Sequence, residues 1–254
     1  MLAACAGDPD AVPPAAGPSE SDPASEPLFV DRAAELGLDF THLNGMTGSL
    51  LYAEMMGAGV AVLDQDGDGD LDIYLVQGGP LGVPAASGEE PPSERLYRND
   101  LGPGGRWRFV DVSARAGALA SGYGMGVAAG DVDADGDPDL YVTQLGPNVL
   151  LVNRGDGSFA DRTVESGTGD PGWSVPAVFF DADADGREDL YVGNYVEYSV
   201  AADRACFSAT GARDYCGPTA YPGASDRLYR NLGGGRFEDV STASGIGRRG
   251  RTLG

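Results

Sequence analysis

The feature that most constrains this chain is an acidic nine-residue segment that occurs three times. The copies read "DQDGDGDLD" from residue 64, "DVDADGDPD" from residue 131 and "DADADGRED" from residue 181. Each copy runs directly into an apolar segment, and together they hold 15 of the chain's 39 acidic residues. Part of the formal charge of −22 is therefore concentrated in three short turns, and the fold must accommodate that repulsion three times.

Fixed offsets around these acidic loops define a tandem repeat. Each loop is followed by Asp-apolar-Tyr-apolar, then by a segment that ends in Asn, and then by Phe-x-Asp with a glycine six residues beyond the Asp. The three complete copies have Asn at 99, 153 and 231, Phe at 109, 159 and 237, and Gly at 117, 167 and 245, and a partial fourth copy has Phe29, Asp31 and Gly37. A recurring period of this kind indicates a repeat architecture.

Each repeat contains four short segments that are expected to be strands. They are rich in Tyr, Val, Ile and Phe, alternate with a period near two, and are separated by glycine-rich breaks, whereas no amphipathic pattern of helical length stands out. The sequence therefore predicts an all-β fold, a β-propeller of four-stranded blades. A β-solenoid is the alternative, but its repeats are much shorter than the 50 residues between Asp131 and Asp181.

About three blades are expected from this chain. Three complete units and the start of another at 250–254 fall short of the roughly 4–8 blades that a closed propeller needs. We therefore expect an incomplete propeller, the N-terminal fragment of a longer protein.

The spacing of the acids predicts three calcium sites. Acidic residues at positions 1, 3, 5 and 9 of each loop point into one concavity, the glycine at position 6 permits the bend, and position 7 offers its backbone carbonyl. This matches the first nine positions of an EF-hand loop, and so carboxylate-rich a site favours calcium over magnesium. The alternative is an acidic, solvated hairpin without metal. The predicted ligands are Asp64, Asp66, Asp68, Asp70 and Asp72; Asp131, Asp133, Asp135, Asp137 and Asp139; and Asp181, Asp183, Asp185, Arg187 and Asp189.

The strong net negative charge excludes several classes of partner. A chain this acidic repels nucleic acid and anionic membrane surfaces. No apolar run reaches the ~18 residues of a membrane span. The single histidine, His42, has no second histidine or cysteine for a transition-metal site, and the simpler interpretation is a hydrogen-bonded loop residue.

The first 27 residues differ in composition from the repeats at 28–254. Cys5 follows Leu-Ala-Ala, which resembles a lipoprotein lipobox, and residues 6–27 are a Pro/Ala/Ser/acidic tether that we expect to be disordered. A lipid on Cys5 would anchor the repeats outside the cytoplasm, at a bacterial cell surface. That compartment permits a disulfide between Cys206 and Cys216; the alternative is two free thiols in a cytosolic protein.

The motifs resemble a known repeat family. The stretches "YAEMMGAGVAVLDQDGDGDLDIYLV" and "GYGMGVAAGD", and the Cys206/Cys216 pair before "GPTAYPG", are similar to FG-GAP/VCBS repeats and, more widely, to the bacterial cartilage acidic protein-like, ASPIC/UnbV-associated family. The resemblance covers about residues 28–254. It implies a secreted or surface-exposed, calcium-stabilised propeller used for binding, with no established catalytic residues.

Three functions are compatible with these features. The first is a non-catalytic module for adhesion to a protein or carbohydrate, the second is part of a secreted enzyme acting on glycans, and the third is a purely structural repeat.

In an up-and-down blade, the calcium loops lie at one end, while the insertions 77–94 and 194–226 and the links between blades lie at the other. The ligand-binding face predicted at that second end comprises His42, Tyr52, Glu54, Tyr123, Trp173, Tyr195, Tyr198, Tyr215 and Tyr221. The alternative is that these aromatics only pack their own loops.

Overall fold

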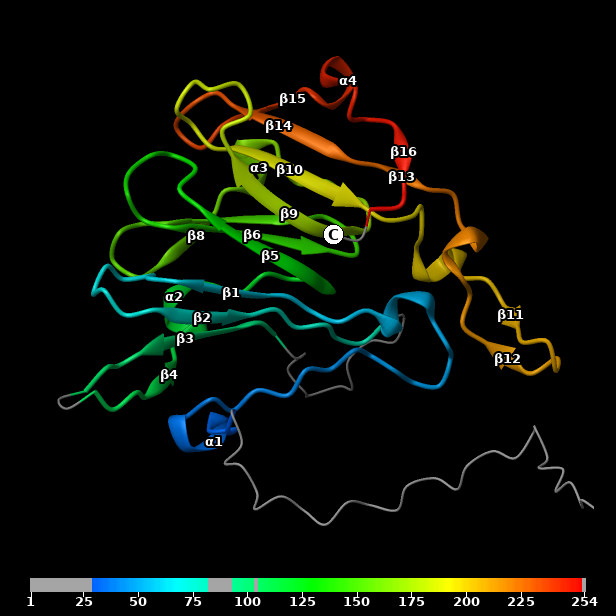
Figure 1. The fold of residues 1–254 in the computed structure, drawn as a ribbon, viewed down its shortest axis with the longest axis horizontal. Coiled ribbons are helices and arrows are strands. Elements are labelled where there is room, and N and C mark those ends of the chain that lie inside the picture. Colours follow the sequence, from blue (N-terminus) through cyan, green and yellow to red (C-terminus); the bar gives the residue numbers. More distant parts are fainter. Residues whose placement is uncertain (1–28, 82–92, 103–104, 253–254) are drawn as a thin grey trace, which may run out of the picture. The chain divides into compact units, whose positions relative to one another are not determined.

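The computed structural model describes residues 29–81, 93–102 and 105–252 (Figure 1). Residues Ala33–Gly254 form one compact unit, and the described residues 29–32 belong to a separate one. Cys5, the tether at 6–27 and residues 82–92 of the first insertion lie outside the described residues. Among the residues that the structure describes, no helix is long and apolar enough to cross a membrane.

Three four-stranded antiparallel sheets confirm the all-β prediction. In each sheet the strands follow one another in sequence order, with one small insertion of strands in the third. The first sheet contains β1 (Val60–Leu63), β2 (Asp72–Leu75), β3 (Arg95–Asn99) and β4 (Phe109–Asp111); the second contains β5 (Gly124–Gly130), β6 (Asp139–Gln144), β7 (Val149–Asn153) and β8 (Phe159–Asp161); the third contains β9 (Ser174–Phe180), β10 (Asp189–Asn194), β14 (Arg227–Asn231) and β15 (Phe237–Asp239).

The register places every acidic loop in the turn between the first two strands of a sheet. The last residue of the first strand pairs with the Asp at position 9, as Leu63 does with Asp72, Gly130 with Asp139, and Phe180 with Asp189. β1 lies beside β5, and β5 beside β9. The three acidic loops consequently lie at the same end of their sheets, as Figure 1 shows on the left.

One-turn helices explain the fixed glycines of the repeat. They are α1 (Ala33–Leu36), α2 (Ser113–Ala116), α3 (Thr163–Ser166) and α4 (Ser241–Ser244). Before α2, α3 and α4, the Asp of the Phe-x-Asp motif accepts a hydrogen bond from the N–H of the first helical residue, as Asp161 does from Thr163 at 2.9 Å. The next glycine closes the helix with positive φ, for example 77° at Gly167, which a residue without Cβ adopts at little cost. The sequence did not predict these helices because a single turn has no periodicity.

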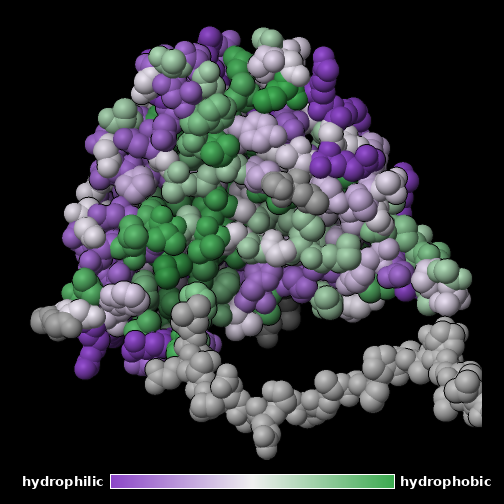
Figure 2. Space-filling view, viewed as in Figure 1, coloured by the Kyte–Doolittle hydropathy of each residue, from purple (hydrophilic) through white to green (hydrophobic). Residues whose placement is uncertain are grey.

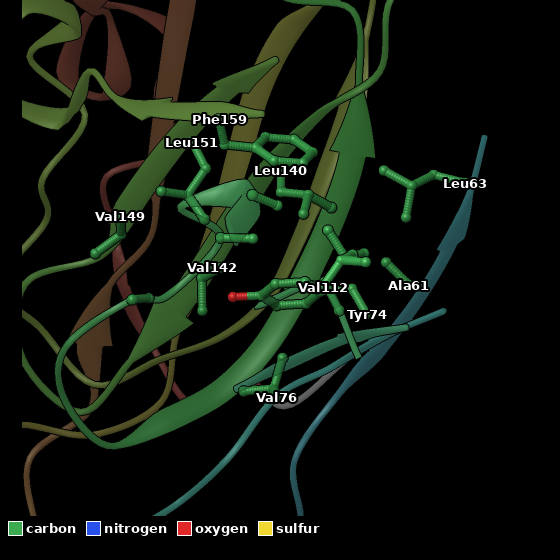
Figure 3. Packing of buried hydrophobic residues seen from close by; sticks show 14 residues of the cluster. Ala61, Leu63, Tyr74, Val76, Val112, Leu140, Val142, Val149, Leu151 and Phe159 are labelled. Carbon is green, nitrogen blue, oxygen red and sulfur yellow. The ribbon is translucent and has the colours of Figure 1, made fainter. Parts of the chain in front are cut away.

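The hydrophobic core lies between neighbouring sheets rather than within one of them. Every residue of β6 is buried because the second sheet is covered on both faces. Figure 3 shows Leu140, Val142 and Leu151 of the second sheet packed toward Leu63 and Tyr74 of the first. A similar cluster joins the second and third sheets. At about 1.5–3 kcal/mol for each large apolar side chain buried, these contacts are the main stabilisation of the stack.

The outer faces of the first strands remain open to solvent. Hydrophobic side chains gather over β1, β5 and β9 in the middle of the view in Figure 2. They include Val60 and Val62 from β1 and Val178 and Phe180 from β9.

The end opposite the acidic loops is built from connections. Most of the second insertion is irregular, with η2 (Val200–Ala202), β11 (Cys206–Phe207), β12 (Arg213–Asp214), η3 (Pro218–Ala220) and β13 (Ala224–Ser225), which pairs with β16 (Arg249–Gly250). A disulfide joins Cys206 to Cys216 with their Cα atoms 5.1 Å apart, which confirms the predicted pair. The link between residues 38 and 58 contributes η1 (Tyr52–Met55) to the same end.

Candidate metal centres

Each acidic loop brings three carboxylates together. Positions 1, 3 and 9 each offer an oxygen that lies within 4.8 Å of the other two. The groups are Asp64, Asp66 and Asp72; Asp131, Asp133 and Asp139; and Asp181, Asp183 and Asp189. These nine aspartates are all among the residues predicted as ligands, and their convergence at so short a distance is costly unless a cation or protons offset the charge.

The Asp at position 1 shapes the loop. In the first loop, Asp64 accepts hydrogen bonds from the N–H groups of Asp68 at 3.1 Å and Gly69 at 3.0 Å. The other two loops have the same pair of bonds at the same distances. The position-6 glycine has positive φ in every loop, 89° at Gly69, which confirms the sharp bend expected there.

One carboxylate oxygen of the Asp at position 3 lacks a donor in two of the loops, as far as the described residues show. Oδ1 of Asp66 and Oδ1 of Asp133 are buried and accept no hydrogen bond from the part of the chain that the structure describes. Burial, followed by the charge of the neighbouring position-5 carboxylate, raises the pKa of both side chains. A buried carboxylate oxygen without a donor is unfavourable in the free protein. It is well suited to a hard cation, whose preferred ligand is such an oxygen, so the residues present fit calcium.

The Asp at position 9 is buried and links its loop to the third strand of the sheet by hydrogen bonds. In the second loop, Asp139 is fully buried, and it accepts hydrogen bonds from the N–H groups of Val132 and Asn153, both at 2.8 Å. The corresponding bonds are present at Asp72 and Asp189. Burial raises the pKa of Asp72 to about 6 and that of Asp139 to about 7, although their N–H donors oppose the shift.

Positions 5 and 7 lie outside these converging groups. The position-5 carboxylate instead accepts the N–H of position 7, as Asp68 does from Asp70 at 2.9 Å. In the third loop the Arg187 side chain pairs with Asp185 and donates from Nε to the Asn231 carbonyl at 3.1 Å. The roles of Asp135 and Asp137 as ligands, like those of their counterparts in the other loops, stay predictions.

Position 4 adopts a left-handed backbone conformation that the sequence did not reveal, and in the second and third loops this conformation is strained because the residue is alanine. Its φ is positive in all three loops: 71° at Gly67, 62° at Ala134 and 61° at Ala184. An alanine in this region costs roughly 1–2 kcal/mol. Such strain persists only where the surroundings impose it, and it often accompanies functional sites.

The asparagines at the ends of the third strands connect the loops to the next sheet. Asn153 Nδ2 in the second sheet donates to the Gln65 carbonyl of the first loop at 2.9 Å, and Asn231 Nδ2 in the third sheet donates to the Val132 carbonyl of the second loop at 2.8 Å. Both carbonyls belong to position 2, between two of the converging carboxylates. The repeated Asn was visible in the sequence, but no role was predicted for it.

Within the described part of the chain, no asparagine of a following sheet donates a hydrogen bond to the third loop. Its first eight positions are mostly exposed, including Ala182 at position 2, whereas Gln65 and Val132 are buried. Glu188 of the third loop also reaches the second, where its Oε2 accepts the Asp131 N–H at 2.8 Å. The second loop is therefore the most enclosed of the three.

The residues predicted to form a ligand-binding face do meet at the opposite end, but most of them are buried. Tyr52 stacks on Tyr195 and Tyr221 and meets the edge of Trp173, with ring centroids 5.2–6.1 Å apart. The buried members are Tyr52, Glu54, Tyr123, Trp173, Tyr195 and Tyr221. Their burial favours the second interpretation, that these side chains pack their own loops.

The other three members of that set are at least partly accessible. Tyr198 and Tyr215 are half-buried, and the Tyr215 hydroxyl donates to Glu54 Oε1 at 2.7 Å. His42 is exposed, although partial burial of its imidazole lowers the pKa of that group.

Comparisons with known proteins identify the repeat. Residues 131–192 match the family model of the FG-GAP-like repeat. Over 108 residues the chain is 33% identical to human cartilage acidic protein 1, a match that covers 41% of this chain and 15% of the human protein. The mouse protein of the same name is 32% identical over 108 residues, which is 41% of this chain and 16% of the mouse protein. The matched segment is therefore a small part of these relatives, and it confirms the resemblance found in the sequence.

Proposed function

Starting from a chain that contains an FG-GAP-like repeat and is related to cartilage acidic protein 1, we propose that it is a calcium-binding β-propeller module that acts outside the cytoplasm. It binds a protein or carbohydrate ligand and catalyses no reaction. One observation carries the calcium assignment: three converging carboxylates recur in three loops, and in two of these the oxygen at position 3 is buried without a donor.

In this proposal, some residues of the chain bind the ion and others orient the binding residues. The carboxylates at positions 1, 3 and 9 supply the ligand oxygens, the backbone N–H groups of positions 5 and 6 orient position 1, and the third-strand Asn orients position 9. The bound Ca²⁺ supplies the positive charge that offsets their mutual repulsion. The loop end of the sheets is stabilised as a result.

A propeller arrangement is supported by the order of the sheets. Their strands run in sequence order, and their first strands lie side by side, as those of neighbouring blades do. The disulfide supports an oxidising location outside the cytoplasm.

A binding role is favoured over a catalytic one by the contacts of Tyr52 and Glu54, two polar side chains at the end opposite the acidic loops. The Tyr52 hydroxyl is hydrogen-bonded to that of Tyr195 at 2.8 Å. Glu54 Oε1 accepts a hydrogen bond from Tyr215, and Glu54 Oε2 is buried without a partner among the described residues. Both side chains are buried, and burial raises the pKa of Tyr52. A hydroxyl and a carboxylate fixed in this way support the packing of the loops rather than proton transfer to a substrate.

Thermal unfolding of matched variants tests the calcium assignment. Calcium should raise the Tm of the chelated protein more than an equal concentration of magnesium does, because only the folded state offers the sites. Asp66→Asn should reduce that increase. Asp70→Asn is the control, since it removes the same charge from the same loop at a position where the third loop has Arg187. Equal effects of the two substitutions would contradict the proposed ligand set.

A further inference from the structure

A groove of about 460 Å³ lies between the second and third sheets at the acidic-loop end. Its walls come from β7, β8 and α3 on one side and from the turn between β14 and β15 on the other. It is lined by Asp133, Val152, Asn153, Arg154, Ala160, Arg162, Glu165, Gly234, Gly235 and Arg236. We propose that this groove, defined by its three arginines, binds an anionic oligosaccharide through carboxylate or sulfate groups.

The three arginines are available for a ligand. Arg154, Arg162 and Arg236 are exposed, and they take part in none of the ion pairs or side-chain hydrogen bonds found among the described residues. Other arginines of the chain, such as Arg95 and Arg230, are paired with carboxylates. Arg106 and Arg108 are likewise without an ion pair among the described residues, so what distinguishes these three arginines is that they line one groove. Guanidinium groups match carboxylates and similar oxyanions with paired hydrogen bonds.

The internal repeat shows that the fold does not require these arginines. Arg162 stands where the other two sheets have Val112 and Val240, and Arg154 stands where the first sheet has Asp100. The backbone around the position is the same in each case: the Arg162 N–H donates to the Leu150 carbonyl at 2.9 Å, as the Val112 N–H does to Leu96. The second sheet thus carries two positive charges that the same backbone structure does not need in the other sheets.

The equivalent surface between the first and second sheets has none of the three arginines. The position of Arg236 is taken there by Ser158, and those of Arg154 and Arg162 by Asp100 and Val112. The arginine set is therefore specific to the junction of the second and third sheets, as a ligand site would be and a structural requirement of the repeat would not.

The remaining lining favours a sugar over an acidic peptide. Among the lining residues only Val152 and Ala160 are apolar, so the groove offers little apolar surface to the hydrophobic side chains of a peptide. The N–H groups of Gly234 and Gly235 have no acceptor within the described part of the chain, and they can donate to hydroxyl groups. Three guanidinium groups and these two N–H groups can thus donate to a polyhydroxylated anion, beside the carboxylates of Asp133 and Glu165.

Calcium and the anionic ligand should help each other to bind. Asp133 lines the groove and belongs to the converging carboxylates of the second loop. Charge compensation at that loop removes repulsion between Asp133 and an anion in the groove. This coupling rests on the proposed calcium function, whereas the arginine site stands on the groove alone.

Calorimetric titration with four short probes tests the inference: trigalacturonate, a sulfated galactotriose, neutral galactotriose and the peptide Glu-Glu-Glu. We expect at least one of the two anionic sugars to bind and the neutral sugar not to bind. Tighter binding of trigalacturonate would identify carboxylate as the preferred group, and tighter binding of the sulfated galactotriose would identify sulfate. Rising salt should weaken binding because exposed charges are screened.

Three variants locate the binding site. Arg162→Val and Arg236→Ser introduce residues that the other repeats already carry, so the fold should be retained, and each should lower the affinity about tenfold or more. Arg108→Ser is the matched control, because Arg108 has the same place before the Phe-x-Asp motif of the first sheet but lies outside the groove. It should leave the affinity unchanged.

The outcomes separate this inference from the calcium assignment. No binding of either anionic sugar to the calcium-loaded protein would overturn the inference, as would an equal loss with Arg108→Ser or tighter binding of the peptide. Sugar binding that persists unchanged in EDTA, with the arginine variants impaired, would uphold the groove and contradict only its coupling to calcium. Calcium uptake without sugar binding would leave the proposed calcium sites in place and refute the groove.

Discussion

Replacing Asn153 with alanine tests how the loops are joined to the next sheet. Its Nδ2 donates to the Gln65 carbonyl at 2.9 Å and to the Pro138 carbonyl at 3.3 Å, and its Oδ1 accepts the Gly155 N–H at 3.1 Å. Gln65 is buried, so water does not readily replace the lost donor. An orphaned buried carbonyl costs about 1–3 kcal/mol and each lost hydrogen bond about 1 kcal/mol. We expect Asn153→Ala to lower the free energy of unfolding by about 2–4 kcal/mol.

Asn99→Ala is the matched control for this substitution. Asn99 has the same place in the first sheet, but among the described residues its Nδ2 donates only to the Leu71 carbonyl of its own repeat at 3.3 Å, and its Oδ1 has no partner there. Its loss should cost about 1 kcal/mol or less. Urea unfolding at a fixed calcium concentration measures both, with m-values compared to confirm that the unfolded states are equivalent. Equal destabilisation by the two substitutions would show that the contact between sheets contributes nothing beyond the local one.

Three further predictions concern pH, the disulfide and the aromatic cluster. Because burial raises the pKa of Asp72 to about 6 and of Asp139 to about 7, against about 4 in the unfolded chain, these groups favour the folded, calcium-free protein at low pH and lose that contribution as pH rises toward 7. Calcium requires the ionised form, so the increase in Tm on adding calcium should be larger at pH 8 than at pH 5.5; an increase independent of pH would contradict this. Reducing the Cys206–Cys216 bond, which closes a loop with a sequence separation of 10, should cost ~3 kcal/mol at most in unfolding experiments and leave calcium affinity unchanged. Trp173→Ala should cost about 3–5 kcal/mol, as expected for a core residue, while a loss below 1 kcal/mol would indicate that its burial contributes little.

Local patterns in the sequence were sufficient to predict the repeat. Alternating apolar residues gave the strands, and the spacing of the aspartates placed each acidic loop between two of them, because both features depend on neighbours along the chain. The conserved offset of glycines such as Gly117 marked a fixed turn, although a single helical turn is too short to be recognised by its period.

Contacts between sheets could not be predicted from the sequence. Asn153 and Asn231 act on loops 88 and 99 residues away, and their partners are backbone carbonyls that carry no mark in the sequence. The aromatics around Trp173 pack together, but residue type alone did not decide between burial and exposure. The arginine groove depends on two sheets that meet only in the folded chain.

The number of calcium ions bound per chain tests the central claim most directly. Equilibrium dialysis against radioactive calcium should give three ions per chain, with Kd values on the order of 10⁻⁴–10⁻³ M and the weakest binding at the exposed third loop. Asp66→Asn, Asp133→Asn and Asp183→Asn should each remove about one ion while the protein stays folded. A folded chain that takes up no calcium at millimolar concentrations, or whose uptake is unchanged by these substitutions, would contradict the assignment of the loops as calcium sites.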